Sequence, residues 1–322
     1  MTAFLTLTPN PALDIATRTE RVEPTHKLRC DTVQRFPGGG GVNVARVLHR
    51  LGADVQAWAA TGGPAGAQLV ALLQAEGVPT QAYPVHGDTR ENIAVLETET
   101  GREFRFVLPG PTWTHDEWTT ALTQLGQHLR EARSGLRWLV GSGSLPPGVP
   151  DDFYAQAATI ARQHGVGMAL DTSGKALAAA LRTGVQVVKP SLRELRELLQ
   201  QPLEDITAAC TAARSLVLHG QAETVALSMG EQGAVLATRL GAWHAPALQV
   251  PASTGTTGAG DCFLATLLWA LDSGQPAPEA LRWGVAAGAA ALLAPGTTLA
   301  QAEDIHRLHA SAPVPTLIIT AG

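Results

Sequence analysis

Hydrophobic and polar positions near the N-terminus alternate with the period of two that is typical of β-strands. This alternation predicts strands over residues 4–8 and 12–17. It also predicts a β-hairpin over residues 93–107, with its turn at Thr100-Gly101. The chain therefore begins with strands rather than with a basic, apolar leader, and we expect no signal peptide.

Beyond residue 110, short apolar runs alternate with segments whose apolar residues recur every three or four positions. Together with two earlier segments, the predicted helices are residues 42–48, 67–76, 118–130, 153–164, 192–199, 203–218 and 263–271. Buried strands are predicted at residues 136–140, 167–170, 185–188, 224–227 and 234–237. This alternation implies βαβ units, and hence an α/β fold with a mostly parallel central sheet covered by helices on both faces.

Two strand-rich pieces, roughly residues 12–35 and 85–110, do not follow this alternation. They indicate an accessory β-layer. We expect one α/β domain over residues 1–322 into which this layer is inserted.

Composition and charge exclude several classes of protein. Apolar residues make up 45% of the 322 residues and charged residues 16%, which is enough for a large core and unlike a disordered chain. The formal charge of −5 argues against a nucleic-acid surface. Three distant cysteines, Cys30, Cys210 and Cys262, favour reduced thiols over a disulfide framework or structural zinc.

The most membrane-like run, residues 283–294, is shorter than the roughly 20 apolar residues that a spanning helix needs. The sequence therefore predicts a soluble, cytoplasmic protein that does not bind a membrane.

The glycine-rich sequence TGTTGAGDCF at residues 254–263 is the strongest candidate for chemistry. Small residues before a helix let backbone N–H groups converge on an anion at the helix N-terminus. Asp261, in the same turn, is a carboxylate that can take a proton from an attacking hydroxyl. The alternative is that Asp261 only caps its helix. The spacing matches neither a Walker A loop nor a dinucleotide fingerprint.

A second glycine run, residues 38–41, also opens onto a helix and allows close approach of a ligand. Asn43 lies in the first turn of that helix, where its amide can donate to and accept from sugar hydroxyls. A flexible surface loop is the alternative. Arg90, Arg105 and Lys27 are either solvated or form a basic patch for a sugar phosphate, since arginine binds phosphate oxygens bidentately.

Five motifs occur in one order along nearly the whole chain: GGGGVNVAR at 38–46, VGSGSLPPG at 140–148, VKP at 188–190, SMGEQGA at 228–234 and TTGAGDCF at 256–263. In this combination they resemble the ribokinase-like sugar kinases, in particular the phosphofructokinase B branch. The resemblance implies a ribokinase-like fold in which the accessory β-layer is a lid over the sugar site. In this branch the lid also forms a dimer contact, which implies a homodimer.

The resemblance also implies roles for individual residues. Asp261 would deprotonate the sugar hydroxyl, while the N–H groups of Gly258, Ala259 and Gly260 would surround the transferring γ-phosphoryl group. The sugar hydroxyls would be held by Asp14, Gly39 and Asn43. The phosphates on the sugar side would be held by Arg90, Arg105, Ser144 and Lys27.

Mg-ATP would bind a second set of residues, namely Lys189, Ser191, Glu194, Ser228, Gly230, Gly233, Thr257, Gly258 and Gly260. Glu194 would hold magnesium through water. Ser191 stands where the family has asparagine, so that the positioning of magnesium or phosphate would run through water or another group.

A second departure is Ala294-Pro295, which replaces an Asn-Gln pair near the adenine pocket. Relatives bind a monovalent cation through backbone carbonyls, and the matching loop for K⁺ here comprises Gly255, Thr257, Ala294 and Gly296.

The implied activity is ATP-dependent phosphorylation of fructose 6-phosphate to fructose 1,6-bisphosphate, because the T-R-x-N and RFV-x-PG segments follow the 6-phosphofructokinase pattern. Tagatose 6-phosphate and fructose 1-phosphate remain alternative substrates. From another class, a non-catalytic sugar-phosphate-binding protein remains open, and Ser191 is the one feature that favours it.

Overall fold

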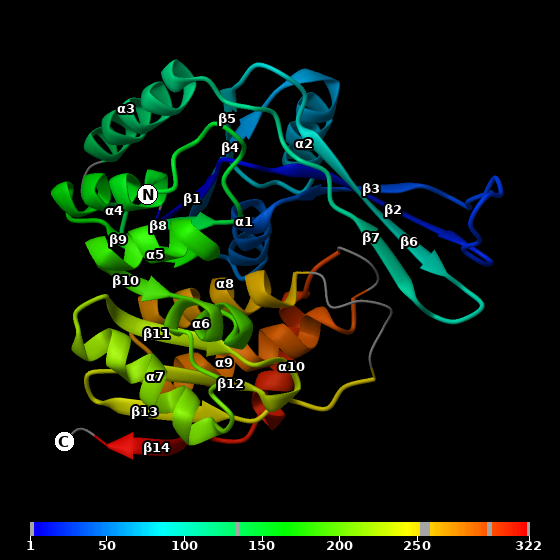
Figure 1. The fold of residues 1–322 in the computed structure, drawn as a ribbon. Helices are drawn as coiled ribbons and strands as arrows, with labels where there is room; N and C mark the ends of the chain where they lie inside the picture. The colour runs from blue at the N-terminus through cyan, green and yellow to red at the C-terminus, as the bar shows by residue number, and fades with distance from the viewer. Residues whose placement is uncertain (1–2, 133–134, 252–257, 295–297, 321–322) are drawn as a thin grey trace.

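The computed structural model describes residues 3–132, 135–251, 258–294 and 298–320. The strands of its large sheet are β1 (Phe4–Thr8), β4 (Val55–Thr61), β5 (Thr80–Pro84), β8 (Trp138–Ser142), β9 (Gly167–Asp171), β10 (Val185–Val188), β11 (Ala222–Ser228), β12 (Ala234–Thr238), β13 (Gly241–Ala245) and β14 (Thr316–Thr320). Their order is β14-β13-β12-β11-β10-β9-β8-β1-β4-β5 (Figure 1). From β5 across to β11 neighbouring strands are parallel, and β12 to β14 add an antiparallel edge.

Two sets of helices cover the two faces of this sheet, as the alternating pattern predicts. One face packs against α1 (Gly40–Arg50), α2 (Gly63–Ala75), α8 (Ala259–Asp272), α9 (Ala277–Ala291) and α10 (Ala302–Ser311). The other packs against α3 (His115–Glu131), α4 (Phe153–Gln163), α5 (Gly174–Thr183), α6 (Leu192–Leu199) and α7 (Ile206–Leu218). All five residues of β1 are buried, because the central strands have helices on both sides.

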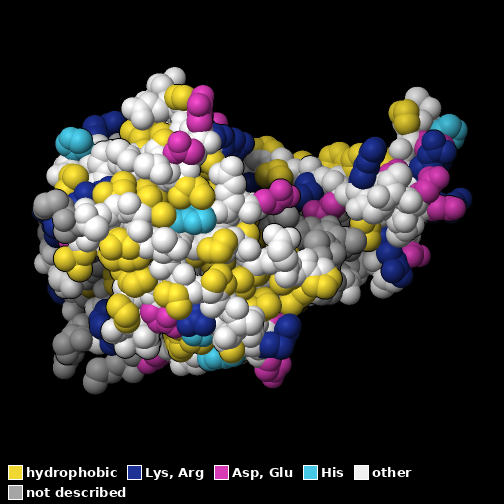
Figure 2. Space-filling model, turned by 90° about the horizontal axis from the view of Figure 1, so that it is seen from below, with side chains coloured by type: hydrophobic (Ala, Val, Ile, Leu, Met, Phe, Trp, Pro, Cys, Tyr) yellow, Lys and Arg dark blue, Asp and Glu magenta, His cyan; other side chains and the backbone are white. Residues whose placement is uncertain are grey.

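A separate four-stranded sheet has the order β3-β2-β6-β7 and comprises β2 (Ala12–Thr19), β3 (Gln34–Gly38), β6 (Arg90–Glu97) and β7 (Glu103–Phe106). The predicted hairpin is confirmed as the antiparallel β6–β7 pair, whereas β2 and β6 pair in parallel. With its connections this sheet extends from the main body as an arm (Figure 1). Charged side chains gather at the far end of the arm (Figure 2).

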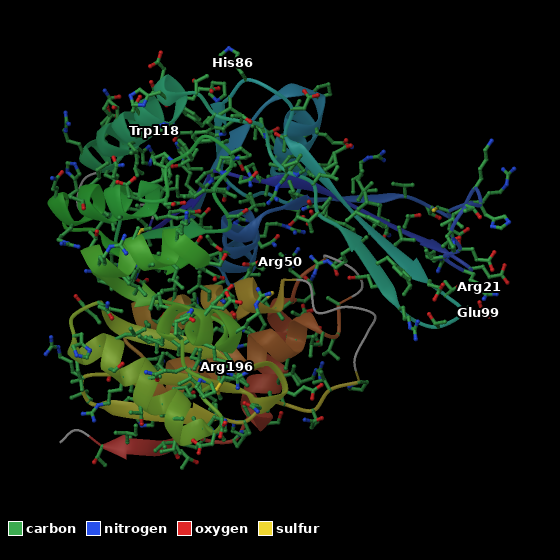
Figure 3. All side chains as sticks on the ribbon, viewed as in Figure 1. Arg21, Arg50, His86, Glu99, Trp118 and Arg196 are labelled. Atoms are coloured by element: carbon green, nitrogen blue, oxygen red, sulfur yellow. The ribbon has the colours of Figure 1, made fainter. Side chains whose placement is uncertain are left out.

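The end of the arm holds the connection between β2 and β3. Arg21, from this connection, lies 3.6 Å from Glu99 of the β6–β7 turn, measured from Nε to Oε2 (Figure 3). Lys27 is exposed in the same connection, and residues 27–30, which have a strand-like pattern, form no strand. Alternation of apolar and polar residues is not enough to form a strand when no neighbouring strand pairs with the segment.

The helix predicted from residue 203 begins at Ile206 instead. Leu203 has φ 44°, in the left-handed region that a helix interior does not use, and Asp205 caps the helix by accepting from the N–H of Ala208. Among the residues that the structure describes, no helix combines the length and the apolar character needed to cross a bilayer.

Candidate active site

The carboxyl ends of the central parallel strands meet the first turn of α8, and the polar residues of the site lie there. Strands β1, β8 and β9 end at Thr8, Ser142 and Asp171, and Lys189 follows directly after β10. Open α/β sheets bind ligands at this edge, because the loops after parallel strands converge there.

Asp261 lies in the first turn of α8, whose N-cap is Gly258 with φ 79°. Oδ2 of Asp261 accepts a hydrogen bond of 2.9 Å from Nδ2 of Asn43, in α1. Burial raises the pKa of Asp261 to about 7, and the negative charge of Asp171 adds to this effect. A carboxyl group that titrates near neutral pH is suited to accept a proton in catalysis.

Lys189 forms the cationic side of the site. It is only 5% exposed, and its Nζ lies 3.1 Å from Oδ2 of Asp171. Burial by itself lowers the pKa of Lys189, but the attraction of Asp171 outweighs it, so the pKa lies above its ordinary value. A Cβ placed on Gly260 would lie 3.4 Å from this ammonium group. The glycine therefore leaves the space between α8 and Lys189 open.

Ser191 and Glu194 form the beginning of α6. The Ser191 hydroxyl accepts from the N–H of Glu194 at 3.3 Å, and the Glu194 carboxylate accepts from the N–H of Ser191 at 2.8 Å. This capping box gives Ser191 a structural task besides any contact with nucleotide. Ser228, the last residue of β11, forms an isolated β-bridge with Ser191, so these two predicted nucleotide residues lie side by side.

Gly230 and Gly233 belong to the turn after β11. Gly230 begins the short 3₁₀ helix Gly230–Gln232, and Gly233 has φ 88°. A side chain on Gly233 would overlap the carbonyl oxygen of Ala245, so this glycine is required by the fold whatever it does for the nucleotide.

Asp14, in β2, lies at the junction of the arm and the main body. Oδ1 of Asp14 accepts a hydrogen bond of 2.9 Å from Nδ2 of Asn92, in β6. A Cβ on Gly38 would overlap Oδ2 of Asp14. Burial raises the pKa of Asp14, while Asn92 and the positive charges of Arg105 and Arg90 lower it in part. The charges of Arg90 and Arg105 thus both act on Asp14.

Gly39 is the N-cap of α1 with φ 106°. A side chain at neighbouring Gly40 would overlap the hydroxyl of Ser142, and one at Gly41 would overlap that of Thr8. The glycine run therefore brings the beginning of α1 into direct contact with the ends of β1 and β8, which places Asn43 beside Asp261.

An open pocket of about 580 Å³ is lined by Asn10, Arg90, Ser144 and residues of the loops at 107–110 and 145–151, and the charge of Arg90 acts on Asp14. The Arg90 guanidinium donates to the carbonyl oxygens of Asn10, Pro11 and Leu108. Carbonyl groups orient this cation without neutralising its charge. Arg90 therefore brings to the pocket wall a fixed positive charge suited to an anion, while the carboxylate of Asp151 also lines the pocket.

Arg105 and Lys27 are placed differently. Arg105 is about half exposed on β7 and does not line the pocket, although its charge acts on Asp14. Lys27 lies in the connection at the end of the arm, and the structure does not bring it to the pocket of its own chain.

The donors at the site fit Mg-ATP. Lys189 and the N-terminus of α8 offer positive charge to phosphates, and Glu194 offers one carboxylate oxygen beyond its capping bond. In the described part of the chain, no cluster of three or more His, Cys, Asp or Glu side chains could hold a metal ion. Magnesium is commonly bound by one or two carboxylates together with substrate phosphates, and Glu194 could supply such a carboxylate.

Of the loop predicted to bind a monovalent cation, Ala294 lies within the described residues, and Gly255, Thr257 and Gly296 lie outside them. Three residues of the site were not singled out from the sequence: Asp171, Asn92 and Asn10. Asp171 and Asn10 follow predicted strands, so their position at a strand end was the available signal, and Asn92 is the last residue of the T-R-x-N segment.

A model of the pfkB family of carbohydrate kinases matches residues 10–304. This span contains Asp14, Asn43, Arg90, Lys189 and Asp261. The chain belongs to this family. It is therefore a carbohydrate kinase, a phosphotransferase with an alcohol acceptor.

Curated relatives within and near this family carry more specific names. The chain is 42% identical over 313 residues to the ATP-dependent 6-phosphofructokinase isozyme 2 of Mycobacterium tuberculosis, covering 97% of this chain and 91% of that one. It is 34% identical over 280 residues to the 1-phosphofructokinase of Xanthomonas campestris, covering 83% of each.

Solved structures of phosphofructokinase-2 from Escherichia coli have the same fold. The complex with substrates and products has a TM-score of 0.90 and 36% identity, covering 97% of this chain and 99% of that chain. The same protein was solved with potassium, TM-score 0.90, and as a tetrameric inhibited form, TM-score 0.88. The ribokinase-like fold predicted from the motifs is thereby confirmed.

Proposed function

We propose that this kinase transfers the γ-phosphoryl group of ATP to fructose 6-phosphate. The observation that carries the proposal is the combination of two charged features near Asp14. One is the carboxylate of Asp261 at the N-terminus of α8, whose pKa Asp14 raises, and the other is the pocket with Arg90, whose charge acts on Asp14. A phosphorylated sugar that spans these features presents a hydroxyl at one end and a phosphate at the other.

Asp261 is the base in this proposal. Its carboxylate accepts the proton of the attacking hydroxyl while the hydroxyl oxygen forms the new bond to phosphorus and ADP leaves. Asn43 keeps Oδ2 of Asp261 hydrogen-bonded, and in this proposal the other carboxylate oxygen faces the sugar. Asp14, Gly39 and Asn43 hold the remaining sugar hydroxyls. Correct placement of the two reactants supplies much of the rate enhancement in such transfers.

On the nucleotide side, Lys189 and the N–H groups of Gly258, Ala259 and Gly260 face the phosphates, with Asp171 holding Lys189 in place. Bound magnesium would neutralise charge that develops on the phosphate oxygens. Glu194 would hold it through water, and Ser191, Ser228, Gly230 and Gly233 would shape the nucleotide loop.

On the sugar side, Arg90 binds the phosphate that the substrate already carries, supported by Ser144 and by Asn10. Nδ2 of Asn10 donates to the Ser144 hydroxyl at 3.2 Å, and its buried Oδ1 has no hydrogen-bond partner among the described residues. Arg105 and Lys27 contribute positive charge from the arm. The lid role of the arm is part of the same proposal, because Asp14 lies on its first strand.

We further propose that the chain works as a homodimer formed through the arm and binds K⁺ beside Ala294. The potassium complex and the tetrameric form of the E. coli protein support a monovalent cation and self-association in general. The exposed apolar side chains of the arm support the location of the contact.

A panel of acceptors tests the substrate. With Mg-ATP, we expect the highest kcat/KM for fructose 6-phosphate, lower values for tagatose 6-phosphate and fructose 1-phosphate, and the lowest for fructose and ribose. Arg90→Ala should lower kcat/KM for fructose 6-phosphate by about 100-fold, because a charged hydrogen bond is lost, and should leave that for fructose nearly unchanged.

Preference for an unphosphorylated sugar would contradict the assignment of the Arg90 pocket. A higher kcat/KM with fructose 1-phosphate would move the proposal to the activity for which the Xanthomonas relative is named. Binding of sugar phosphate without consumption of ATP would indicate a non-catalytic binding protein.

A further inference from the structure

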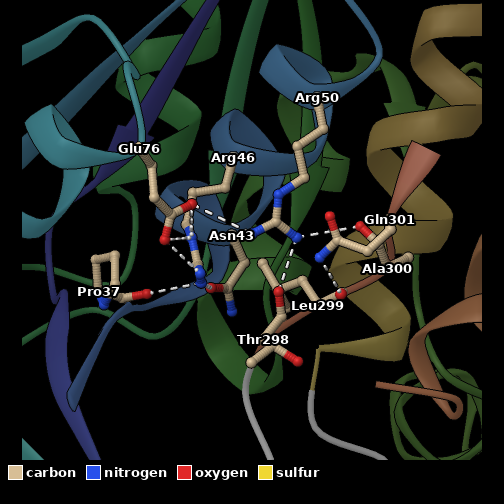
Figure 4. Close-up of polar contacts among 9 residues, drawn as sticks. All are labelled: Pro37, Asn43, Arg46, Arg50, Glu76, Thr298, Leu299, Ala300 and Gln301. Carbon is tan, nitrogen blue, oxygen red and sulfur yellow. Dashed lines mark hydrogen bonds and ion pairs between the residues drawn. The ribbon is translucent and has the colours of Figure 1, made fainter. Parts of the chain in front are cut away.

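Two arginines of α1 share one carboxylate, that of Glu76 at the C-terminal end of α2 (Figure 4). Arg46 donates from Nε to Oε2 at 2.9 Å and from Nη2 to Oε1 at 2.7 Å. Arg50 donates from Nη2 to Oε2 at 3.2 Å. Arg46 is only 1% exposed, so its charge depends on Glu76 in an environment of low polarity.

The other end of Arg46 reaches the base through Asn43. Nη1 of Arg46 donates to the carbonyl oxygen of Pro37 at 3.1 Å and makes a long contact of 3.5 Å with Oδ1 of Asn43. Nδ2 of the same amide donates to Asp261 at 2.9 Å. An amide can turn over and present either atom. The cation on the Oδ1 side fixes the orientation in which the N–H faces Asp261.

Arg50 also acts on the first turn of α8, through residues 298–300. Its Nη1 donates to the carbonyl oxygens of Thr298 at 2.7 Å and Ala300 at 3.1 Å. Between them, Leu299 has φ 63°, an uncommon conformation for a residue with a side chain. The Leu299 side chain packs so closely on Gly258, the N-cap of α8, that a Cβ on Gly258 would overlap it.

We propose that Glu76 is a positioning residue for the base Asp261. It holds Arg46 so that Asn43 presents its N–H to the carboxylate, and it holds Arg50 so that residues 298–300 stay against the first turn of α8. The inference rests on the proposed role of Asp261 as base. Glu76 itself does not touch the reacting atoms.

A purely stabilising ion pair is the alternative, and the charges around Asp261 allow the two to be separated. Asp171, Lys189 and Asp14 act on the Asp261 carboxylate, and none of them contacts Glu76. Loss of a merely stabilising pair would lower the melting temperature without raising the titration midpoint of Asp261, because removal of a nearby negative charge favours the ionised carboxylate. Loss of a positioning residue would change that titration.

The test compares Glu76→Gln with Asp272→Asn. Asp272 also binds an arginine bidentately, Arg137, but at the opposite end of α8. With Mg-ATP and fructose 6-phosphate, Glu76→Gln should lower kcat by about 10- to 100-fold while both KM values stay within about threefold, as expected for a misplaced base. Asp272→Asn should leave kcat and KM unchanged.

A second measurement does not depend on the substrate. In protein labelled with ¹³C at aspartate carboxyl groups, the resonance that disappears in Asp261→Asn reports the titration of Asp261. Glu76→Gln should raise its midpoint by about one pH unit, because a hydrogen bond to the charged form is lost. Asp272→Asn should leave the midpoint in place. If the wild type proves inactive on every sugar, the proposed function fails, and this titration still tests the positioning.

An unchanged midpoint and unchanged kcat in a folded Glu76→Gln protein would overturn the proposal. If Glu76→Gln fails to fold, the titration midpoint of Asp261 in Arg46→Lys tests the proposal instead. Lysine keeps the charge beside Glu76 but lacks the fork that reaches both Glu76 and Asn43. It should therefore raise the midpoint as well, and an unchanged midpoint would overturn the proposal.

Discussion

Several charged residues of the site act on the pKa of Asp261. Asn43 stabilises its charged form, whereas burial and the negative charges of Asp171 and Asp14 disfavour it, and the balance raises the pKa to about 7. An ordinary aspartate would be too weak a base to take a proton efficiently from an alcohol. The same environment makes the base sensitive to pH.

The activity should therefore fall on the acid side. As pH decreases through about 7, Asp261 becomes protonated and kcat/KM should drop, approaching tenfold for each further pH unit. The measurement is the pH profile of kcat/KM with fructose 6-phosphate for wild type and Asp171→Asn. Removal of the Asp171 charge should shift the acid limb to lower pH, because that charge raises the pKa of Asp261. The same substrate is used for both proteins, so the substrate itself does not cause the shift. Superimposable profiles would show that Asp261 does not set the acid limb.

At the scale of elements, the glycine run before α1 joins the arm to the main body. Gly38 ends β3 beside Asp14, and Gly40 and Gly41 let α1 contact the ends of β8 and β1. The spacing of small residues thus determines where Asp14 and Asn43 lie relative to each other.

Gly38→Ala tests this role. The added Cβ would overlap Oδ2 of Asp14, and the flexible carboxylate should move out of its bond with Asn92. We expect about 1 kcal/mol lower stability in urea unfolding and a KM for fructose 6-phosphate raised about tenfold. The matched control is Gly126→Ala in α3, where the new Cβ would lie 3.5 Å from Ile160, an ordinary contact, and should add about 0.5–1 kcal/mol of stability. An unchanged KM in Gly38→Ala would contradict the placement of Asp14 at the sugar.

The strands whose apolar residues follow a clear pattern were predicted from the sequence, and strands without such a pattern were missed. Strands β1, β8, β10 and β12 were predicted within a residue or two of their bounds. Strand β4, with the sequence VQAWAAT, was not predicted, because alanine-rich runs fit a helix or a strand equally well. The parallel pairing of β2 with β6 joins segments far apart in the chain, which no local pattern indicates.

The candidate site shows the same limit. Asp261, Asn43 and Lys189 could be predicted because they lie in or beside glycine-rich turns with recognisable motifs. Asp171 and Glu76 could not, because their importance comes from the side chains that the fold places next to them. Lys27 shows the reverse case, a motif residue that the fold of a single chain leaves at the end of the arm.

At the scale of the whole molecule, the arm exposes apolar surface that a monomer would leave in water. Phe106, Val107 and Leu108 are 53%, 61% and 45% exposed, on β7 and directly after it. Contiguous apolar side chains of this kind are typical of an interface.

If the proposed dimer forms through this surface, Phe106→Asp should shift the protein to monomer in sedimentation velocity at micromolar concentration, because a buried charge opposes association. The control is Leu240→Asp, at the β12–β13 turn of the large sheet, where a leucine 74% exposed should be replaced without effect on the oligomeric state. A Phe106→Asp protein that sediments as the wild type does would place the interface elsewhere.

The central claim is that Asp261 accepts the proton of the sugar hydroxyl, and Asp261→Asn tests it most directly. The substitution keeps the size of the side chain and removes its basicity, so binding of ATP and fructose 6-phosphate by calorimetry should stay within a few-fold of wild type. The rate of fructose 1,6-bisphosphate formation should fall by about 10²- to 10⁴-fold. Near-normal turnover in a folded, substrate-binding Asp261→Asn protein would contradict the account.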